Sequence, residues 1–263
     1  MTAGSSGEPV VSSIDGAVVT ITIDRPERRN ALSPAVVRGL YDALTAAEAE
    51  PSVSVAVLTG AGDRAFCAGG DLSGMGATSK KAQHLERGEV GGLFRRLQAS
   101  RLPVVARVNG HALAGGFGLM LSCDLVVAAD DAELGMPEVN VGLWPFMVAA
   151  LVQRDVPRKV ALDLMLTGRR IPASEGERWG FVNRVVPRDG LDASVAELTQ
   201  TLTSKSPLVL SLGKSSYYAA EDMEVEQKLA YLNGMLSLCL ESEDAVEGVT
   251  AFLQKRPPEW KGR

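Results

Sequence analysis

The chain has 263 residues, of which 46% are hydrophobic and 22% charged, and its formal net charge is -5. Such a length and composition are typical of one large globular domain, or of one domain with a small appendage. Nucleic acids and anionic membranes attract basic surfaces, so a mildly acidic chain argues against both as partners.

The supply of metal-binding and thiol side chains is small. The three cysteines (Cys67, Cys123 and Cys239) and the two histidines (His84 and His111) lie far apart in the sequence. This inventory argues against a disulfide framework and against a metal site. No stretch is long and apolar enough to predict a membrane span. Residues 1–9 are small and polar, which predicts a flexible leader rather than a signal peptide, and we expect a cytoplasmic protein.

In the first half of the chain the pattern predicts strands alternating with turns and helices. Asp15-Gly16 separates two apolar, β-prone runs, which predicts a hairpin. Ser33-Pro34 suits the start of a helix that runs to about Glu50, because serine caps a helix and proline fits its first turn. Buried strands are expected at residues 53–59, 103–109 and 124–129. This alternation is typical of an α/β fold.

The second half is mainly helical. Helices are expected at residues 145–154, 157–166 and 173–179, followed by a short strand at 182–186. After Pro187 the pattern predicts helices at 191–204, 207–219, 224–240 and 244–254. The composition shift near Pro187 divides the chain into an α/β core of residues 10–187 and a C-terminal helical region of residues 188–263.

Two Gly-rich turns are candidates for a site. The first, residues 65–72, follows a buried strand, where α/β proteins place their ligands. In the second, residues 109–119, glycines open a helix, so that free amides and the positive end of the helix dipole suit an oxyanion. Each pattern alone also fits a bland alternative: a tight surface loop for the first, and a helix packed closely on a strand for the second.

Taken together at this spacing, the two turns resemble the signature segments of the crotonase superfamily, the enoyl-CoA hydratases and isomerases. The resemblance covers nearly the whole chain: residues 25–32, 65–72, 103–124, 136–138, 166–169, 179–182 and 251–256. It implies an α/β fold with a crotonase-type ββα spiral core and a C-terminal α-helical trimerisation region. A homotrimer or hexamer is therefore expected.

The resemblance also implies roles for residues in both turns. The amides of Gly70 and Gly115 would hold the thioester oxygen of an acyl-CoA, where enolate-like charge develops. Coenzyme A would enter as part of the substrate, with no separate cofactor. The residues implied in binding the substrate and its coenzyme A are Arg28, Ala68, Gly70, Asp71, Leu72, Gly115, Phe252 and Lys255. The last two would reach the adenine and phosphates across a subunit interface, although Lys255 is equally a solvated charge.

One of the two acids of a family hydratase is missing. Hydration needs one group to activate water and another to deliver a proton. The resemblance places the first acid at Gly118 and the second at Glu138, in the run Met136-Pro137-Glu138. Glu138 is therefore the candidate catalytic acid/base, with residues 144–147 forming an apolar wall beside it and residues 75–92 lining the acyl pocket.

Three functions remain open on these residues. A single glutamate suits an isomerase, which removes a proton from C2 or C4 of an enoyl-CoA and returns it at the other end. An atypical hydratase would replace the first glutamate by an ordered water or a distant residue, and Gly118→Glu would then raise its rate if the pocket has room. A CoA-binding regulatory or assembly subunit that has lost catalysis would keep the Gly-rich turns without needing Glu138.

Overall fold

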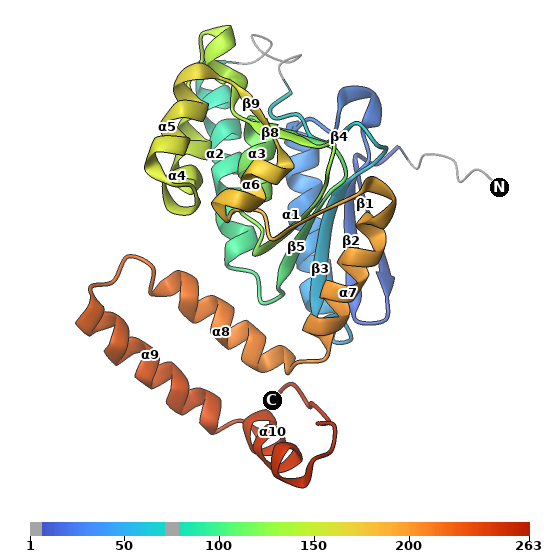
Figure 1. The fold of residues 1–263 in the computed structure, drawn as a ribbon, viewed down its shortest axis with the longest axis vertical. Helices are drawn as coiled ribbons and strands as arrows, with labels where there is room; N and C mark the ends of the chain where they lie inside the picture. The colour runs from blue at the N-terminus through green and yellow to red at the C-terminus, as the bar shows by residue number, and fades with distance from the viewer. Residues whose placement is uncertain (1–6, 72–78) are drawn as a thin grey trace, which may run out of the picture.

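Two β-sheets form the centre of the protein in the computed structural model, which describes residues 7–71 and 79–263 (Figure 1). The larger sheet has six strands in the order β1-β2-β3-β5-β7-β10, and the smaller has four in the order β4-β6-β8-β9. The strands are β1 Val10–Asp15, β2 Val18–Ile23, β3 Val55–Gly60, β4 Ala65–Cys67, β5 Val104–Val108, β6 His111–Leu113, β7 Leu125–Ala129, β8 Glu133–Gly135, β9 Arg170–Pro172 and β10 Arg184–Val186. In the larger sheet β1 and β2 pair antiparallel and the other neighbours pair parallel.

Two features predicted from local chemistry are confirmed. The hairpin around Asp15-Gly16 pairs Val10 with Ile23 and Asp15 with Val18. The first long helix, α1 (Pro34–Ala49), begins where Ser33 was expected to cap it. The Ser33 hydroxyl accepts a hydrogen bond from the Val36 amide at 3.3 Å, which satisfies one of the free amides at the start of the helix.

The larger sheet is covered on both faces. Along β3, Ala56 and Leu58 pack in the apolar cluster that contains α1, whereas Val55 and Val57 pack in the cluster that contains α7 (Leu191–Thr203). Alternate residues of a strand point to opposite faces, so α1 and α7 lie on opposite sides of the sheet. Helix α7 packs on the sheet although it follows Pro187, and the domain boundary after residue 187 stays a prediction.

The other helices of the second half lie within two residues of the predicted ranges. They are α4 Phe146–Asp155, α5 Arg158–Thr167, α6 Ala173–Trp179, α8 Pro207–Ala219, α9 Val225–Leu240 and α10 Glu243–Gln254. A short helix near the second turn, α3, spans Gly115–Leu121, and the described residues include the 3-10 helices η1 Pro26–Arg28, η3 Pro137–Val141 and η4 Arg188–Gly190.

Helix α2 (Lys80–Gln98) is the main element that the sequence analysis did not identify as a helix. Its interior contains Gly88, Gly91 and Gly92, and each such glycine weakens a helix by about 1 kcal/mol relative to alanine. Tertiary packing outweighs that cost. Leu93, Phe94 and Leu97 are buried against the core, and a side chain at Gly92 would lie 2.6 Å from the Tyr41 hydroxyl of α1. Gly91 and Gly92 therefore allow α4 and α1 to approach α2 closely, whereas a side-chain carbon at Gly88 would meet no described atom.

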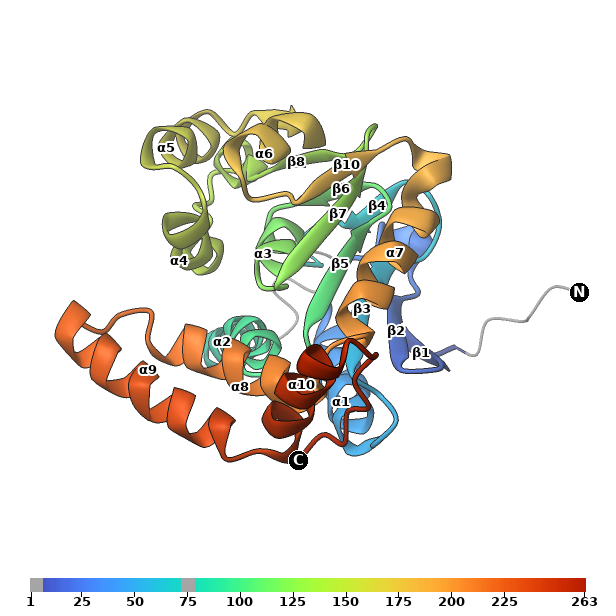
Figure 2. The ribbon, with the colours of Figure 1, turned by 60° about the horizontal axis from the view of Figure 1, so that its bottom comes forward.

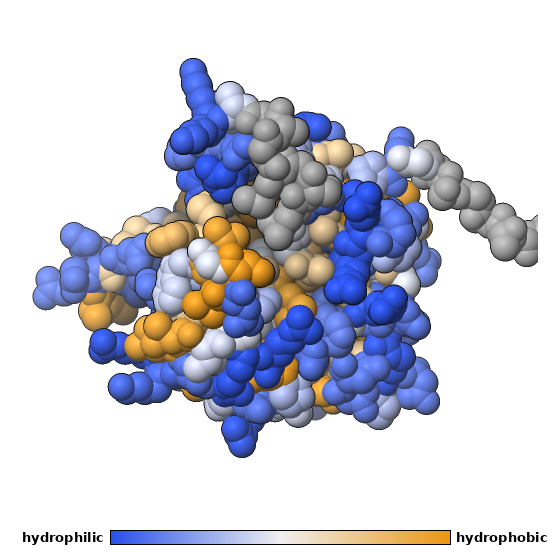
Figure 3. All heavy atoms as spheres, turned by 90° about the horizontal axis from the view of Figure 1, so that it is seen from above, coloured by the Kyte–Doolittle hydropathy of each residue, from blue (hydrophilic) through white to orange (hydrophobic). Residues whose placement is uncertain are grey.

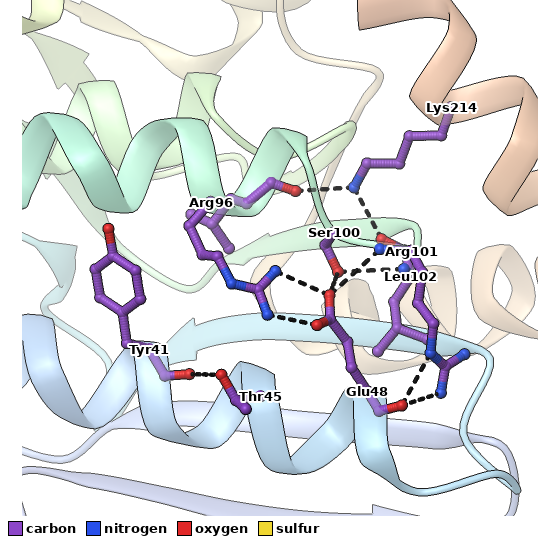
Figure 4. A network of polar contacts seen from close by, with 9 residues as sticks. Tyr41, Thr45, Glu48, Arg96, Ser100, Arg101, Leu102 and Lys214 are labelled. Carbon is purple, nitrogen blue, oxygen red and sulfur yellow. Dashed lines mark hydrogen bonds and ion pairs between the residues drawn. The ribbon is translucent and has the colours of Figure 1, made fainter.

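A polar network ties α1 to the end of α2 (Figure 4). The Glu48 carboxylate accepts a hydrogen bond from Arg96 at 2.9 Å and one from the Ser100 hydroxyl at 2.6 Å. Burial acts to raise the pKa of Glu48, but these hydrogen bonds outweigh it, so its pKa lies below its usual range. The Arg101 guanidinium donates to the backbone oxygen of Glu48 at 2.7 Å and 2.9 Å. The C-terminal turn of α2 is thus fixed to α1.

A buried ion pair anchors α8 to the same region. The Lys214 ammonium donates to the carbonyl oxygens of Leu97 at 2.9 Å and Leu102 at 2.8 Å, as Figure 4 shows. It also lies 2.6 Å from the Asp124 carboxylate, and the two side chains are only 7% and 17% exposed. Asp124 accepts a further hydrogen bond from the Tyr218 hydroxyl at 2.9 Å. Lys214 and Tyr218 therefore join α8 to the strands β5 and β7.

We expect Lys214→Met to lower the free energy of unfolding by about 3–5 kcal/mol, because it leaves the buried Asp124 carboxylate without its cation. Urea denaturation would measure the loss. Lys205→Met, at an exposed position just before α8, is the matched control and should change stability by less than about 0.5 kcal/mol. Equal stability of both variants would contradict the anchoring role of Lys214.

Helices α8 to α10 extend away from the sheets in both ribbon views (Figures 1 and 2). In α9 no residue is buried, and Leu229 is 65% exposed. In α10 Phe252 is 81% exposed. Other exposed apolar side chains of these helices are Val225, Leu236, Leu238, Leu240, Val246, Val249 and Leu253. In the described ranges no helix has the length and apolar character needed to cross a membrane.

Candidate active site

The two Gly-rich turns meet because the strands that lead into them are neighbours. Strands β4 and β6 pair parallel, with Cys67 opposite Ala112. Both turns therefore leave the same edge of the small sheet. A side-chain carbon built on Gly69 would lie 3.2 Å from the Gly115 amide nitrogen, and one built on Gly115 would lie 3.6 Å from the Gly70 nitrogen. The predicted pair of amide donors is thus brought together.

The first turn is held on both sides of Gly70. The Leu32 amide donates to the Gly69 oxygen at 2.8 Å, and the Asp71 amide donates to the Leu32 oxygen at 2.9 Å. These two hydrogen bonds form a parallel β-bridge between Leu32 and Gly70, in which the Gly70 amide points away from Leu32. Within the part of the chain that the structure describes, the Gly70 amide donates to no protein group. It is therefore a fixed and available donor.

The second turn leaves a matching donor at the start of α3. The amides of Phe117 and Gly118 donate to the Ala114 oxygen at 2.9 Å and 3.2 Å. The Gly115 amide precedes them and has no acceptor among the described residues. Because the first amides of a helix carry the positive end of its dipole, Gly115 offers a polarised N–H beside that of Gly70.

Ala114 adopts an unusual backbone conformation for a residue with a side chain. Its φ is 53° and its ψ is -126°, and its amide donates to the Gly135 oxygen at 2.8 Å. Backbone conformations of this kind cost about 1–3 kcal/mol and persist only where surrounding contacts hold them. The turn that presents Gly115 is therefore strained.

We expect Ala114→Gly to raise the free energy of unfolding by about 1 kcal/mol, because glycine adopts this conformation without steric strain. Thermal denaturation would measure the change. Ala46→Gly, on the exposed face of α1, should instead lower stability by about 1 kcal/mol. If both variants lose stability equally, Ala114 is not strained.

Glu138 reaches the same edge of the small sheet. Strand β8 pairs with β6, with Gly135 opposite Leu113, and the chain then enters η3, where Glu138 is the second residue. Its Oε2 atom is buried and has no hydrogen-bond partner within the described residues. Burial raises the pKa of Glu138 above its usual value. A carboxylate in this state is suited to proton transfer.

The position of the missing acid is closed by apolar side chains. Gly118 is buried in α3, and a side-chain carbon there would lie 2.8 Å from Phe94 Cζ and 3.0 Å from Val148 Cγ2. Gly118→Glu was expected to raise the rate of an atypical hydratase if the pocket has room, and these contacts leave no room for the larger side chain. Of the apolar wall expected at residues 144–147, Trp144 packs on the core, whereas Phe146 is 77% exposed. Figure 3 shows hydrophobic residues gathered on the face of the molecule that is seen from above.

The remaining predicted residues separate into two groups. Arg28 lies exposed at the end of η1, and the Ala68 amide donates to the Arg29 oxygen at 3.0 Å, so both adjoin the first turn. Leu72 lies outside the described residues. Phe252 lies in α10, and Lys255 comes directly after this helix. Helix α10 packs on α8 and α9, at the opposite end of the molecule from β4 (Figures 1 and 2). The chain does not bring these two residues to its own turns.

An ion pair that the sequence analysis missed supports the first turn. The Arg25 guanidinium lies 3.1 Å from the Asp71 carboxylate and donates to the Ala31 oxygen at 3.2 Å. Asn30, which is fully buried, accepts from the Arg25 amide and donates to the Ala65 oxygen at 2.7 Å. Residues 25–32 therefore form the frame of the Gly70 turn. Among the described residues no cluster of His, Cys, Asp or Glu is placed to hold a metal ion.

The order of strands and helices and the two meeting turns define a crotonase-type fold. Residues 13–263 match the enoyl-CoA hydratase/isomerase family, and the chain belongs to this family of enzymes. It is 35% identical to a carnitinyl-CoA dehydratase of Proteus mirabilis, over 94% of this chain and 96% of that protein. A carnitinyl-CoA dehydratase of Escherichia coli O157:H7 is 36% identical over 95% of this chain and 97% of its own length.

Solved structures agree with this assignment. An enoyl-CoA hydratase from Bacillus anthracis superposes with a TM-score of 0.92 at 30% identity, covering 97% of this chain and all (100%) of that one. An enoyl-CoA hydratase from Mycobacterium smegmatis gives a TM-score of 0.92 at 33% identity, covering 96% of this chain and 98% of that one. The crotonase-type α/β core predicted from the sequence is confirmed.

Proposed function

We propose that this chain is an acyl-CoA isomerase that moves a carbon–carbon double bond, with Glu138 as its single acid/base. The amides of Gly70 and Gly115 hold the thioester oxygen of the substrate. The observation that carries the proposal is the contrast between Glu138, whose buried oxygen has no partner among the described residues, and Gly118, whose surroundings are filled by Phe94 and Val148.

The reaction follows from one base and two donors. The Glu138 carboxylate takes a proton from C2 of a 3-enoyl-CoA, and the electrons of that C–H bond spread over the dienolate and the thioester oxygen. The two amides stabilise the charge on that oxygen, and each such donor typically contributes about 3–4 kcal/mol to catalysis. Glu138 then returns the proton to C4, so that the double bond moves from C3–C4 to C2–C3. Nothing is oxidised or consumed, and the reaction needs no cofactor besides the coenzyme A of the substrate.

A second candidate is an atypical lyase that adds water to the same thioester or removes it. The dehydratase and hydratase names of the relatives favour it. In that reaction Glu138 would deliver or remove one proton, and a water held by another group would replace the first glutamate. The apolar surroundings of Gly118 count against it, since an ordered water needs polar partners.

A regulatory or assembly subunit that binds coenzyme A is the third candidate. It would use the two turns for binding only and would have no use for an acid beside them. A buried carboxylate oxygen without a partner costs free energy, and Glu138 carries that cost. Its retention favours an enzyme over a subunit without catalysis.

The test is turnover of 3-enoyl-CoA and 2-enoyl-CoA panels, with products separated by chromatography. The proposal expects interconversion of the two classes and proton exchange with solvent at C2 and C4. Formation of 3-hydroxyacyl-CoA alone would support the lyase. Tight binding of coenzyme A without turnover of any thioester would support the regulatory subunit and contradict both enzymatic proposals.

The proposed assembly is a homotrimer or hexamer. The exposed apolar faces of α9 and α10 support it, because a protein that remained monomeric would leave these side chains in water. In such an assembly Phe252 and Lys255 of one subunit would complete the coenzyme A site of another. Light scattering in solution tests this, and a monomer would contradict it. We expect the protein to act in the cytoplasm.

A further inference from the structure

We infer that Phe94 is a specificity-determining residue, whose ring fills the space where a hydratase holds its first acid and keeps water away from the substrate. The inference rests on the proposed function, since it explains why one glutamate would isomerise an enoyl-CoA instead of hydrating it. The contact between Phe94 of α2 and Gly118 of α3 brings together residues 24 positions apart in the sequence.

The contact is tight and apolar. Phe94 and Val148 are each 3% exposed, and a carbon added to Gly118 would lie 2.8 Å from Phe94 Cζ and 3.0 Å from Phe94 Cε2. Separations of this size are shorter than van der Waals contact, so the ring already occupies the volume that a larger residue at 118 would need. Phe94, Val148, Phe117 and Met136 belong to one buried apolar cluster.

Helix α4 closes the same space from its other side. Val148 lies in α4, and the neighbouring Met147 approaches α2 so closely that a side chain at Gly91 would collide with its methyl group. Three helices therefore meet at Gly118, and glycine at 91 and 118 allows them to approach. Phe94 is the large side chain at the meeting point and the one whose truncation would open it.

The chemical consequence concerns water. A buried water needs two to four polar partners, and an apolar space of this kind stays dry. Hydration would join the oxygen of a water molecule to C3, while an acid gives a proton to C2 and a base takes one proton from the water. The three atoms nearest to a side-chain carbon at Gly118 are carbons of Phe94 and Val148, and these offer neither a base nor a hydrogen-bond partner for that water. Proton removal by Glu138 needs neither, so isomerisation proceeds while hydration is suppressed.

The packing itself can be tested without an activity assay. Gly118→Ala is expected to lower the melting temperature by about 5 °C, because overpacking strains the core. In a Phe94→Leu background the same change should cost less than half as much, since the shorter side chain leaves room. Equal losses in both backgrounds would show that Phe94 does not fill the space at Gly118 and would overturn the inference.

The product test uses Phe94→Ala and Leu97→Ala, with purified 3-enoyl-CoA and 2-enoyl-CoA in ¹⁸O-labelled water. Leu97 is the matched control, because it is a buried residue of the same helix, one turn further along. Phe94→Ala is expected to raise the ratio of labelled 3-hydroxyacyl-CoA to isomerised product at least tenfold, and Leu97→Ala to leave it unchanged. An unchanged ratio in Phe94→Ala, or an equal rise in both variants, would overturn the inference. If Phe94→Ala does not fold, Phe94→Leu carries the same comparison.

A gain of function completes the test. In the double variant Phe94→Ala/Gly118→Glu, the new carboxylate can enter the vacated space, and we expect hydration to exceed that of Phe94→Ala alone. Gly118→Glu with Phe94 in place is expected to show no such gain, and a gain there would overturn the inference. A wild-type protein that isomerises no enoyl-CoA would overturn the proposed function and the role of Phe94 together. If the wild type isomerises and Phe94→Ala gives unchanged products, only the role of Phe94 is overturned.

Discussion

Glu138→Gln is expected to lower kcat for enoyl-CoA isomerisation by roughly 10²–10⁴-fold, the usual contribution of a general acid/base. Glutamine keeps the shape of the side chain and cannot accept the C2 proton. KM should change much less, because the proposed amide donors and coenzyme A contacts are left in place by this substitution. The measurement is steady-state kinetics on 3-enoyl-CoA, with binding of a saturated acyl-CoA as the check that the site is intact.

Glu133→Gln is the matched control. Glu133 belongs to β8, the strand that leads to Glu138, but its side chain is 45% exposed and pairs with Arg170 at 3.3 Å. It should keep wild-type kinetics. If Glu138→Gln also keeps wild-type turnover, Glu138 is not the base and the proposed isomerase mechanism is wrong.

The pH dependence provides a second readout of the same residue. Burial raises the pKa of Glu138, and the carboxylate form is the base, so kcat/KM should fall as the pH drops through a value above the ordinary range for glutamate. In Glu138→Gln this inflection should disappear. The free energy of unfolding depends on pH in the opposite direction to kcat/KM. Because the folded pKa exceeds the unfolded one, the folded state holds the proton more tightly, and stability declines as pH rises through that interval.

Local sequence patterns predicted the parts of the fold that local chemistry determines. Asp15-Gly16 and Ser33-Pro34 placed a hairpin and a helix start, because turn and cap preferences act within a few residues. Strands β4, β6 and β8 have only three residues each, too short for an alternating pattern, and the small sheet was not predicted. Helix α2 was missed because its glycines oppose helix formation, and the contacts that compensate, such as those with α1 and α4, come from segments distant in the sequence.

The site likewise combines features that the sequence predicts with features that only contacts between distant segments determine. Gly70, Gly115 and Glu138 were identified from the resemblance, and the structure brings all three to one edge of the small sheet. Their roles stay predictions. The burial of Glu138 and the contact of Phe94 with Gly118 depend on three-dimensional packing between distant segments, so no spacing in the sequence indicates them. The same is true of the ion pair between Arg25 and Asp71, which are 46 residues apart.

Gly116→Ala and Gly70→Ala are expected to act in opposite ways. A side-chain carbon at Gly116 would collide with the carbonyl oxygen of Cys67 and lie 2.6 Å from its carbonyl carbon. Backbone atoms cannot rotate aside, so α3 must move off β4, and the loss in free energy of unfolding should be about 3 kcal/mol or more. Activity should fall with it, because the same movement displaces Gly115.

At Gly70 the added carbon would meet no atom of the described residues within 4 Å, and the backbone there does not have a positive φ. Gly70→Ala should therefore keep its stability within about 0.5 kcal/mol of the wild type. In the proposed mechanism the thioester lies against Gly70, and a methyl group there would displace it from both amides. A displacement of this size typically costs about 10²-fold in kcat/KM.

Gly213→Ala is the control for both changes, because Gly213 lies in α8 and an added carbon there also meets no described atom within 4 Å. It should raise stability by about 0.5–1 kcal/mol, as alanine does in a helix, and leave kinetics unchanged. Denaturation curves and kinetics on the same three variants separate the two roles of glycine. Wild-type kcat/KM in a folded Gly70→Ala protein would mean that the thioester does not bind against Gly70, and the oxyanion site would then have to lie elsewhere.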